Sequence, residues 1–159
     1  MTTLGAAHLT AALAALAFGG LVLLTAKGTH SHRVIGAAFV AAMLVTNLTA
    51  LGIYRLTGTF GPFHALALAS LAILARGVIA VLRRRPGWLV THYYCMGWSY
   101  IGLLAATSAE IAARAPLGLV HDARSGLMIG LIATAVFVAI GFIVLPRLQA
   151  RALVYSRGD

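Results

Sequence analysis

Apolar residues follow this chain in five long blocks, and short polar or basic connections separate each block from the next. The blocks cover residues 4–26, 34–54, 63–82, 88–113 and 126–145. A helix of about 20 apolar residues crosses the ~30 Å hydrocarbon layer of a bilayer. The pattern therefore predicts an all-α integral membrane protein with five transmembrane helices. With connections this short, we expect an antiparallel four-helix core and a fifth helix packed against it.

The composition supports a membrane protein. Of the 159 residues, 61% are hydrophobic and only 9% are charged. A soluble domain of this length cannot bury so much apolar surface. The connections are too short to hold a second domain, so residues 1–159 are predicted to form a single transmembrane domain. The start of the chain lacks the basic region of a secretory signal, so we expect the first block to remain as a helix.

The charge distribution predicts how the helices are oriented. The net charge of +9 comes from 12 Lys and Arg against 3 acids. In a membrane protein this excess marks cytoplasmic connections, so no nucleic acid is expected as a partner. One predicted side holds Lys27, Arg33, Arg83, Arg84, Arg85, Arg147, Arg151 and Arg157, and the other holds Arg55, Arg114 and Arg124. The positive-inside rule then predicts an outer N-terminus and a cytoplasmic C-terminus.

Four histidines occupy matching places, in or next to the first turns of the first four blocks. They are His8, His32, His64 and His92. In an antiparallel four-helix bundle, helices one and three are diagonal, as are helices two and four. His8 would then meet His64 in the outer half, and His32 would meet His92 in the inner half. A six-coordinate b-type haem takes one imidazole on each side of its iron, so two such haems would fit this pattern. Arg76, inside the third block, is a candidate partner for a haem propionate.

This layout resembles that of the small dihaem cytochromes b of bacterial membranes. The resemblance covers the first four blocks and carries over only the four histidines above, as haem ligands. It implies electron transfer in the membrane through haem b, with quinone as a candidate redox partner.

Two non-haem metal sites are alternatives to the haem interpretation, with zinc, copper or iron as the ion. The outer set is a two-histidine, one-carboxylate group made of His8, His64 and Glu110, to which His121 or Asp122 could be added. The inner set consists of His30, His32, His92 and Cys95. The spacing of His30 and His32 suits an extended loop that folds around an ion. Either site would serve a membrane enzyme or a metal-handling protein.

In a third alternative, the protein binds no haem or metal ion and catalyses no reaction. Histidines near helix ends can sit in the wet headgroup layer, and the chain would then be an accessory subunit of a larger membrane complex. The last block carries a stripe of small residues that includes Gly126 and Gly130. Such stripes allow close helix contact, either within one chain or between subunits of a homo-oligomer or larger complex. Asn47, near mid-membrane, is expected to form an interhelical hydrogen bond.

Two sequence motifs carry a further resemblance. They are Lys27-Gly28-Thr29-x-x-His32-Arg33-x-x-Gly36 and His92-x-x-x-Met96-x-x-Ser99-Tyr100. Together they are similar to motifs in a family of uncharacterised bacterial integral membrane proteins, over roughly residues 8–114. The resemblance implies a multi-pass protein of the bacterial inner membrane and draws attention to His32 and His92. It implies no activity, and we see no Ser-His-Asp order or phosphate loop, so the question of an enzyme stays open.

Overall fold

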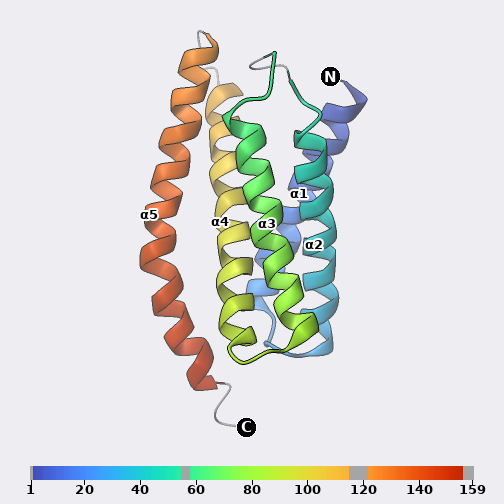
Figure 1. The fold of residues 1–159 in the computed structure, drawn as a ribbon, viewed down its shortest axis with the longest axis vertical. Coiled ribbons are helices and arrows are strands. Elements are labelled where there is room, and N and C mark those ends of the chain that lie inside the picture. Colours follow the sequence, from blue (N-terminus) through green and yellow to red (C-terminus); the bar gives the residue numbers. More distant parts are fainter. Residues whose placement is uncertain (1, 55–57, 115–121, 156–159) are drawn as a thin grey trace. The chain divides into compact units, whose positions relative to one another are not determined.

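The computed structural model describes residues 2–54, 58–114 and 122–155. The secondary structure of these residues is helical, in five helices: α1 (Thr3–Leu24), α2 (His30–Ala50), α3 (Pro62–Arg83), α4 (Trp88–Arg114) and α5 (Ala123–Tyr155) (Figure 1). Each helix matches one of the five apolar blocks, so the predicted all-α class and helix order are confirmed.

In the part of the chain that the structure describes, four stretches of helix are long and apolar enough to cross a membrane. They are α1, α2, α3 and the Arg124–Gln149 part of α5. The remaining helix, α4, is 27 residues long but carries more polar side chains, among them His92, Ser99 and Glu110. The structure thus supports four candidate spans by length and composition, one fewer than the five predicted.

Side-chain caps set where the helices begin. The Thr2 hydroxyl accepts a hydrogen bond from the Gly5 N–H at 3.1 Å, and the Thr29 hydroxyl accepts one from the His32 N–H at 3.2 Å. Each bond satisfies an otherwise unpaired donor of the first turn. Because Thr29 is the cap, α2 begins at His30, four residues before the predicted start at residue 34.

The far end of α5 differs from the prediction. We expected the helix to end at Pro146, because proline lacks the N–H that would bond to the carbonyl of Phe142. The helix instead continues to Tyr155. Two tyrosines of α4 hold these turns: the Tyr93 hydroxyl donates to the Leu145 carbonyl at 2.9 Å, and the Tyr94 hydroxyl donates to Gln149 Oε1 at 2.6 Å.

The contacts within the chain divide it into two compact units, residues 1–72 and 73–159, with the boundary inside α3. In the first unit, α1 and α2 lie side by side and run antiparallel (Figure 1). A Cβ atom at Gly52 would lie 3.0 Å from Leu4, and one at Gly36 would lie 3.7 Å from Val22. Ala15, near the middle of α1, is fully buried. Small residues therefore allow these two helices to approach closely.

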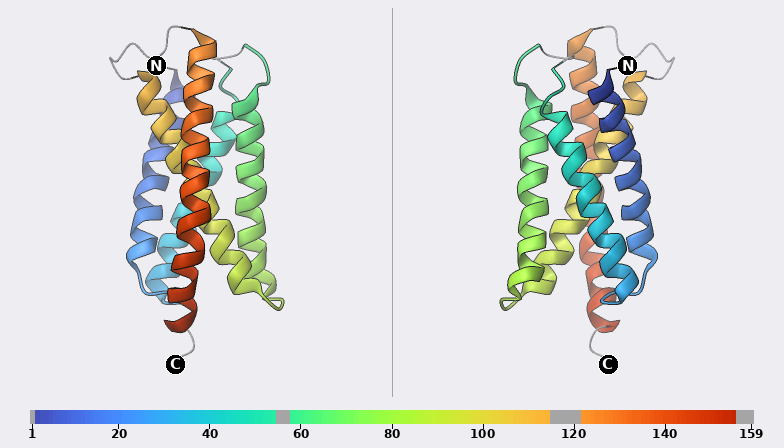
Figure 2. Two further views of the ribbon diagram at one scale, coloured as in Figure 1. Left: turned by 90° about the vertical axis from the view of Figure 1, so that its left-hand side faces the viewer. Right: turned by 90° about the vertical axis from the view of Figure 1, so that its right-hand side faces the viewer.

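In the second unit, α4 and α5 run antiparallel and interlock through two glycines. Leu145 of α5 lies against Gly97 of α4, where an added Cβ would come within 2.6 Å of it. The Trp98 ring lies against Gly141 of α5 at the same distance. This ring also meets Phe142 edge-on, with 5.0 Å between ring centroids. Figure 2 shows α4 crossing α5 obliquely, so the contact is concentrated near these glycines.

The polar residues of α2 bond to their own helix. Asn47 is 7% exposed, and its side-chain amide donates to the Met43 carbonyl at 2.8 Å. The Thr46 hydroxyl donates to the Ala42 carbonyl at the same distance. The predicted interhelical bond of Asn47 is therefore replaced by one within α2, where the carbonyl one turn back is within reach of the side chain.

Candidate functional site

The His8 ring of α1 is fixed against the end of α2. Its Nδ1 atom lies 3.1 Å from the Thr46 carbonyl oxygen and 3.0 Å from Thr49 Oγ1. A carbonyl can only accept, so Nδ1 of His8 carries the proton. In the neutral ring the other nitrogen, Nε2, then presents a lone pair.

His92 of α4 is held in the same way within the second unit. Its Nδ1 atom lies 3.1 Å from the Gly77 carbonyl oxygen of α3. Gly77 is buried, and a Cβ atom there would lie 2.8 Å from the Cβ of Cys95. The absence of a side chain thus lets α3 and α4 approach until the ring reaches the carbonyl. His92 also has its proton on Nδ1 and its lone pair on Nε2.

His64 has the opposite arrangement. Its Nδ1 atom accepts a hydrogen bond from the Gly61 N–H at 3.1 Å, so the proton of the neutral ring is on Nε2. The ring stacks on Tyr54 and Phe60, with centroid separations of 4.6 and 5.2 Å. His64 is only 4% exposed, and its Nε2 atom has no partner in the part of the chain that the structure describes. This nitrogen is therefore a buried hydrogen-bond donor with no acceptor among the described residues.

Both predicted histidine pairs remain predictions. His8 and His64 lie in the same unit, and α1 and α3 both begin at its same end (Figure 1). Their hydrogen bonds are made to α2 and to Gly61 rather than to each other. His32 belongs to the first unit and His92 to the second, so their pairing stays a prediction.

Each of the two predicted metal sites combines residues of both units. His30 and His32 were expected in a loop, but both lie in the first turn of α2. Residues two apart in a helix are separated by roughly 200° around its axis, so these rings cannot converge as a loop would allow. Glu110 is exposed near the end of α4, and Cys95 is buried. Within residues 2–54, 58–114 and 122–155, no group of three or more His, Cys, Asp or Glu could hold a metal ion. His121 lies outside these residues.

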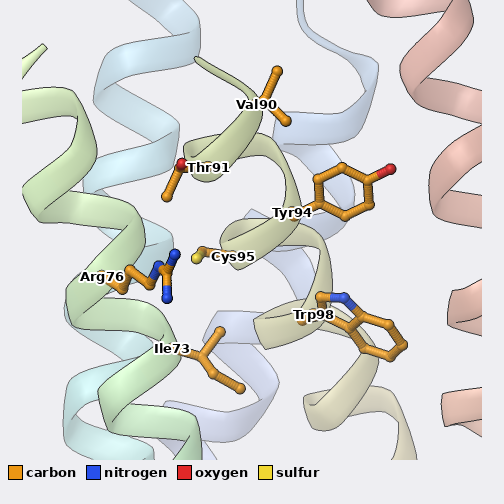
Figure 3. Close-up of a pocket in the computed structure, with 7 residues that line it drawn as sticks. All are labelled: Ile73, Arg76, Val90, Thr91, Tyr94, Cys95 and Trp98. Carbon is orange, nitrogen blue, oxygen red and sulfur yellow. The ribbon is translucent and has the colours of Figure 1, made fainter. Parts of the chain in front are cut away.

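A hollow of about 340 Å³ lies between α3 and α4 in the second unit. It is lined by Ile73, Arg76, Val90, Thr91, Tyr94, Cys95 and Trp98 (Figure 3). The Arg76 guanidinium extends from α3 towards Cys95 of α4. We call this hollow the Arg76 pocket. The sequence singled out Arg76 and Cys95 for separate sites and missed the pocket. The signal for it was the spacing of Thr91, Cys95 and Trp98, which places them on one helical face.

Asp122 directly precedes α5 and caps its first turn. Its Oδ1 atom accepts from the Ser125 N–H at 2.7 Å and from the Ser125 hydroxyl at 2.8 Å. The Ser125 hydroxyl oxygen in turn accepts from the Asp122 N–H at 3.1 Å. The Ser125 backbone and hydroxyl bonds lower the pKa of Asp122 below its ordinary value. Asp122 therefore serves the helix, as half of a capping box.

Comparison with known proteins identifies a family and no activity. Residues 5–146 match the family described as "Predicted membrane protein (DUF2306)". No curated protein matches the chain, and no solved structure does either. The match confirms the expected similarity to an uncharacterised family of membrane proteins.

Proposed function

The chain belongs to the DUF2306 family of predicted membrane proteins, and we propose that it transfers electrons in the membrane through b-type haem. One observation carries the proposal: His8 and His92 both donate Nδ1–H to a main-chain carbonyl of a neighbouring helix. A metal-ligating histidine commonly has this second bond, because it fixes the tautomer and the orientation of the ring. In both rings the Nε2 lone pair is therefore the one that could coordinate an iron ion.

Not every predicted ligand fits a haem equally well. Bound haem would supply reversible one-electron chemistry, with a potential tuned by its axial ligands and burial. His8 and His92 have the suitable tautomer, and His32 remains the proposed partner of His92. His64 has its proton on Nε2, so it fits poorly as the partner of His8. It is better suited to donating to an acceptor oxygen, such as a propionate or a quinone carbonyl.

The proposal includes a topology. We place α4 across the bilayer as a fifth span, since its 27 residues extend about 40 Å. With α4, the first four helices would form an antiparallel core. With this topology, the positive-inside rule predicts that the N-terminus lies outside and the C-terminus in the cytoplasm, in a bacterial inner membrane.

An absorption spectrum of the purified protein tests the function. We expect a Soret band and sharp α and β bands on reduction. His8→Ala and His92→Ala should each remove one haem of two and leave the other, since ligand loss is local. His30→Ala removes an exposed histidine of α2 and serves as the control that keeps both haems. Protein without Soret absorbance after expression with a haem precursor would refute the proposal. Metal analysis of the same sample would then test for an iron, zinc or copper ion.

A further inference from the structure

The Arg76 pocket combines one positive charge, on the exposed Arg76, with mainly apolar lining residues. We propose that this pocket binds the headgroup of an acidic phospholipid from the leaflet at the Arg83 end of α3. The inference goes beyond electron transfer and stands on different residues from the histidines.

The position of Arg76 near the end of an apolar helix favours an anion beside it. Arg76 lies seven residues before the end of α3 at Arg83, which is about 10 Å along the helix. A guanidinium inside a membrane span is costly unless a negative group or water compensates its charge. The described part of the chain shows no hydrogen bond or ion pair from Arg76 to any carboxylate.

The two acids among the described residues, Glu110 and Asp122, lie far from the pocket along their helices. The chain has three acids, Glu110, Asp122 and Asp159. Glu110 follows Trp98 by twelve residues on α4, about 18 Å further along the helix. Asp122 precedes Gln149 by 27 residues, about 40 Å along α5, and Gln149 is the residue that bonds to Tyr94. Asp159 lies outside the described residues. Since neither acid of the described residues lies at the pocket, a counter-ion from another molecule is favoured.

The surroundings of the pocket favour a phospholipid. Arg76 and the Thr91 hydroxyl provide donors, whereas Ile73 and Val90, at 37% and 36% exposure, present apolar surface at the rim. Leu82, further along α3, is 76% exposed. Such surface suits acyl chains, while the basic run Arg83–Arg85 at the end of α3 attracts acidic headgroups. One ligand with an anionic head and apolar chains satisfies both features.

The test measures lipid binding by the full chain in a neutral detergent. Native mass spectrometry would compare dioleoylphosphatidylglycerol with dioleoylphosphatidylcholine. We expect the wild type to retain the acidic lipid preferentially. Arg76→Gln should weaken this binding by about tenfold, the scale of one charge-assisted hydrogen bond, and Arg76→Lys should keep most of it. Arg147→Gln, an exposed arginine of α5 that does not line the pocket, is the control and should bind as the wild type does.

Several results would overturn the inference. Equal retention of the two phospholipids would show that charge is not recognised. An equal loss of acidic-lipid binding in Arg76→Gln and Arg147→Gln would indicate that acidic lipid is attracted to the basic surface in general. A preference for oleate over phosphatidylglycerol would identify the ligand as a fatty acid instead. If samples with Soret absorbance, which contain haem, lose the lipid preference while samples without it keep the preference, Arg76 would be assigned to a haem propionate instead. Because the lipid measurement does not depend on haem, failure of one proposal leaves the other standing.

Discussion

The Nδ1 atom of His92 lies 3.1 Å from the carbonyl oxygen of Gly77, and the two residues belong to adjacent helices, α4 and α3. The bond depends on close backbone approach, because Gly77 faces Cys95 and Met96 with no side chain between them. The tautomer of His92 is therefore decided by a glycine fifteen positions earlier in the chain.

Gly77→Ala should separate α3 from α4. The added Cβ would lie 2.8 Å from the Cβ of Cys95, an atom that cannot move without the backbone. Overpacking of this kind costs about 1–3 kcal/mol of unfolding free energy, and we also expect the bond from His92 to Gly77 to lengthen. Thermal unfolding in detergent and the NMR shifts of the His92 ring would measure the two effects.

Gly102→Ala is the matched control for that variant. Gly102 is also in α4, and a Cβ there would meet nothing within 4 Å. Alanine favours a helix interior over glycine by roughly 0.5–1 kcal/mol, so this variant should be neutral or slightly stabilised. Equal losses in Gly77→Ala and Gly102→Ala would contradict the packing argument.

Tyr93→Phe should weaken the join between α4 and α5. The change removes the hydroxyl that donates to the Leu145 carbonyl, and a hydrogen bond of this type contributes about 0.5–1.5 kcal/mol. Hydrogen exchange should then rise in α5 around Pro146. Tyr54→Phe, which keeps the ring stacked on His64, is the control and should leave α5 unchanged. Unaltered exchange in Tyr93→Phe would show that the helix passes Pro146 without help from α4.

Asp122→Asn should reduce the dependence of stability on pH. The pKa of Asp122 is lowered from 3.8 by its bonds to Ser125, so its charged form stabilises the fold. That contribution is complete above the unfolded-state pKa and is lost as pH falls through the lowered value. Asparagine keeps the capping oxygen without the charge. The stability difference between wild type and variant should thus shrink from pH 7 to pH 3, and a constant difference would contradict the assignment.

Gly126→Leu combined with Gly130→Leu distinguishes internal packing from subunit contact. Both glycines are buried within the single chain, so bulky replacements should lower thermal stability by disrupting the helix contact. We expect the oligomeric state in detergent to stay the same. A stable double variant that has lost its oligomeric state would instead favour a subunit interface.

Reporter fusions test the topology. A reporter active only in the cytoplasm should be active when fused after residue 145, and a periplasmic reporter should be active when placed in the connection between α2 and α3. Activity with the locations exchanged would invert the orientation. Fusions before and after α4 that report the same side would show that α4 does not cross.

The sequence predicted the five helices of the described residues well because each coincides with a long apolar block between short polar or basic connections. It predicted their ends less well. The sequence did not show which residue caps α2, and Thr29 became identifiable as the cap only once the helix start was known. The helix α5 also continues past Pro146, where the Leu145 carbonyl accepts a hydrogen bond from Tyr93, 52 positions earlier in the chain. The state of the histidines was not predictable at all, since the tautomers of His8 and His92 depend on carbonyls 38 and 15 residues distant.

The interlocked glycines of α4 and α5 also limit how the second unit can move. Each helix supplies one projecting side chain and one gap: Leu145 fits Gly97, and Trp98 fits Gly141. If α4 slid along α5 by one residue, Leu145 and Trp98 would both leave the space beside these glycines at the same time. Each would then press against a bulkier side chain next to the glycine. Shear, a common way for packed helices to rearrange, is therefore blocked between this pair. Any working motion of the second unit must leave α4 and α5 moving together as one body.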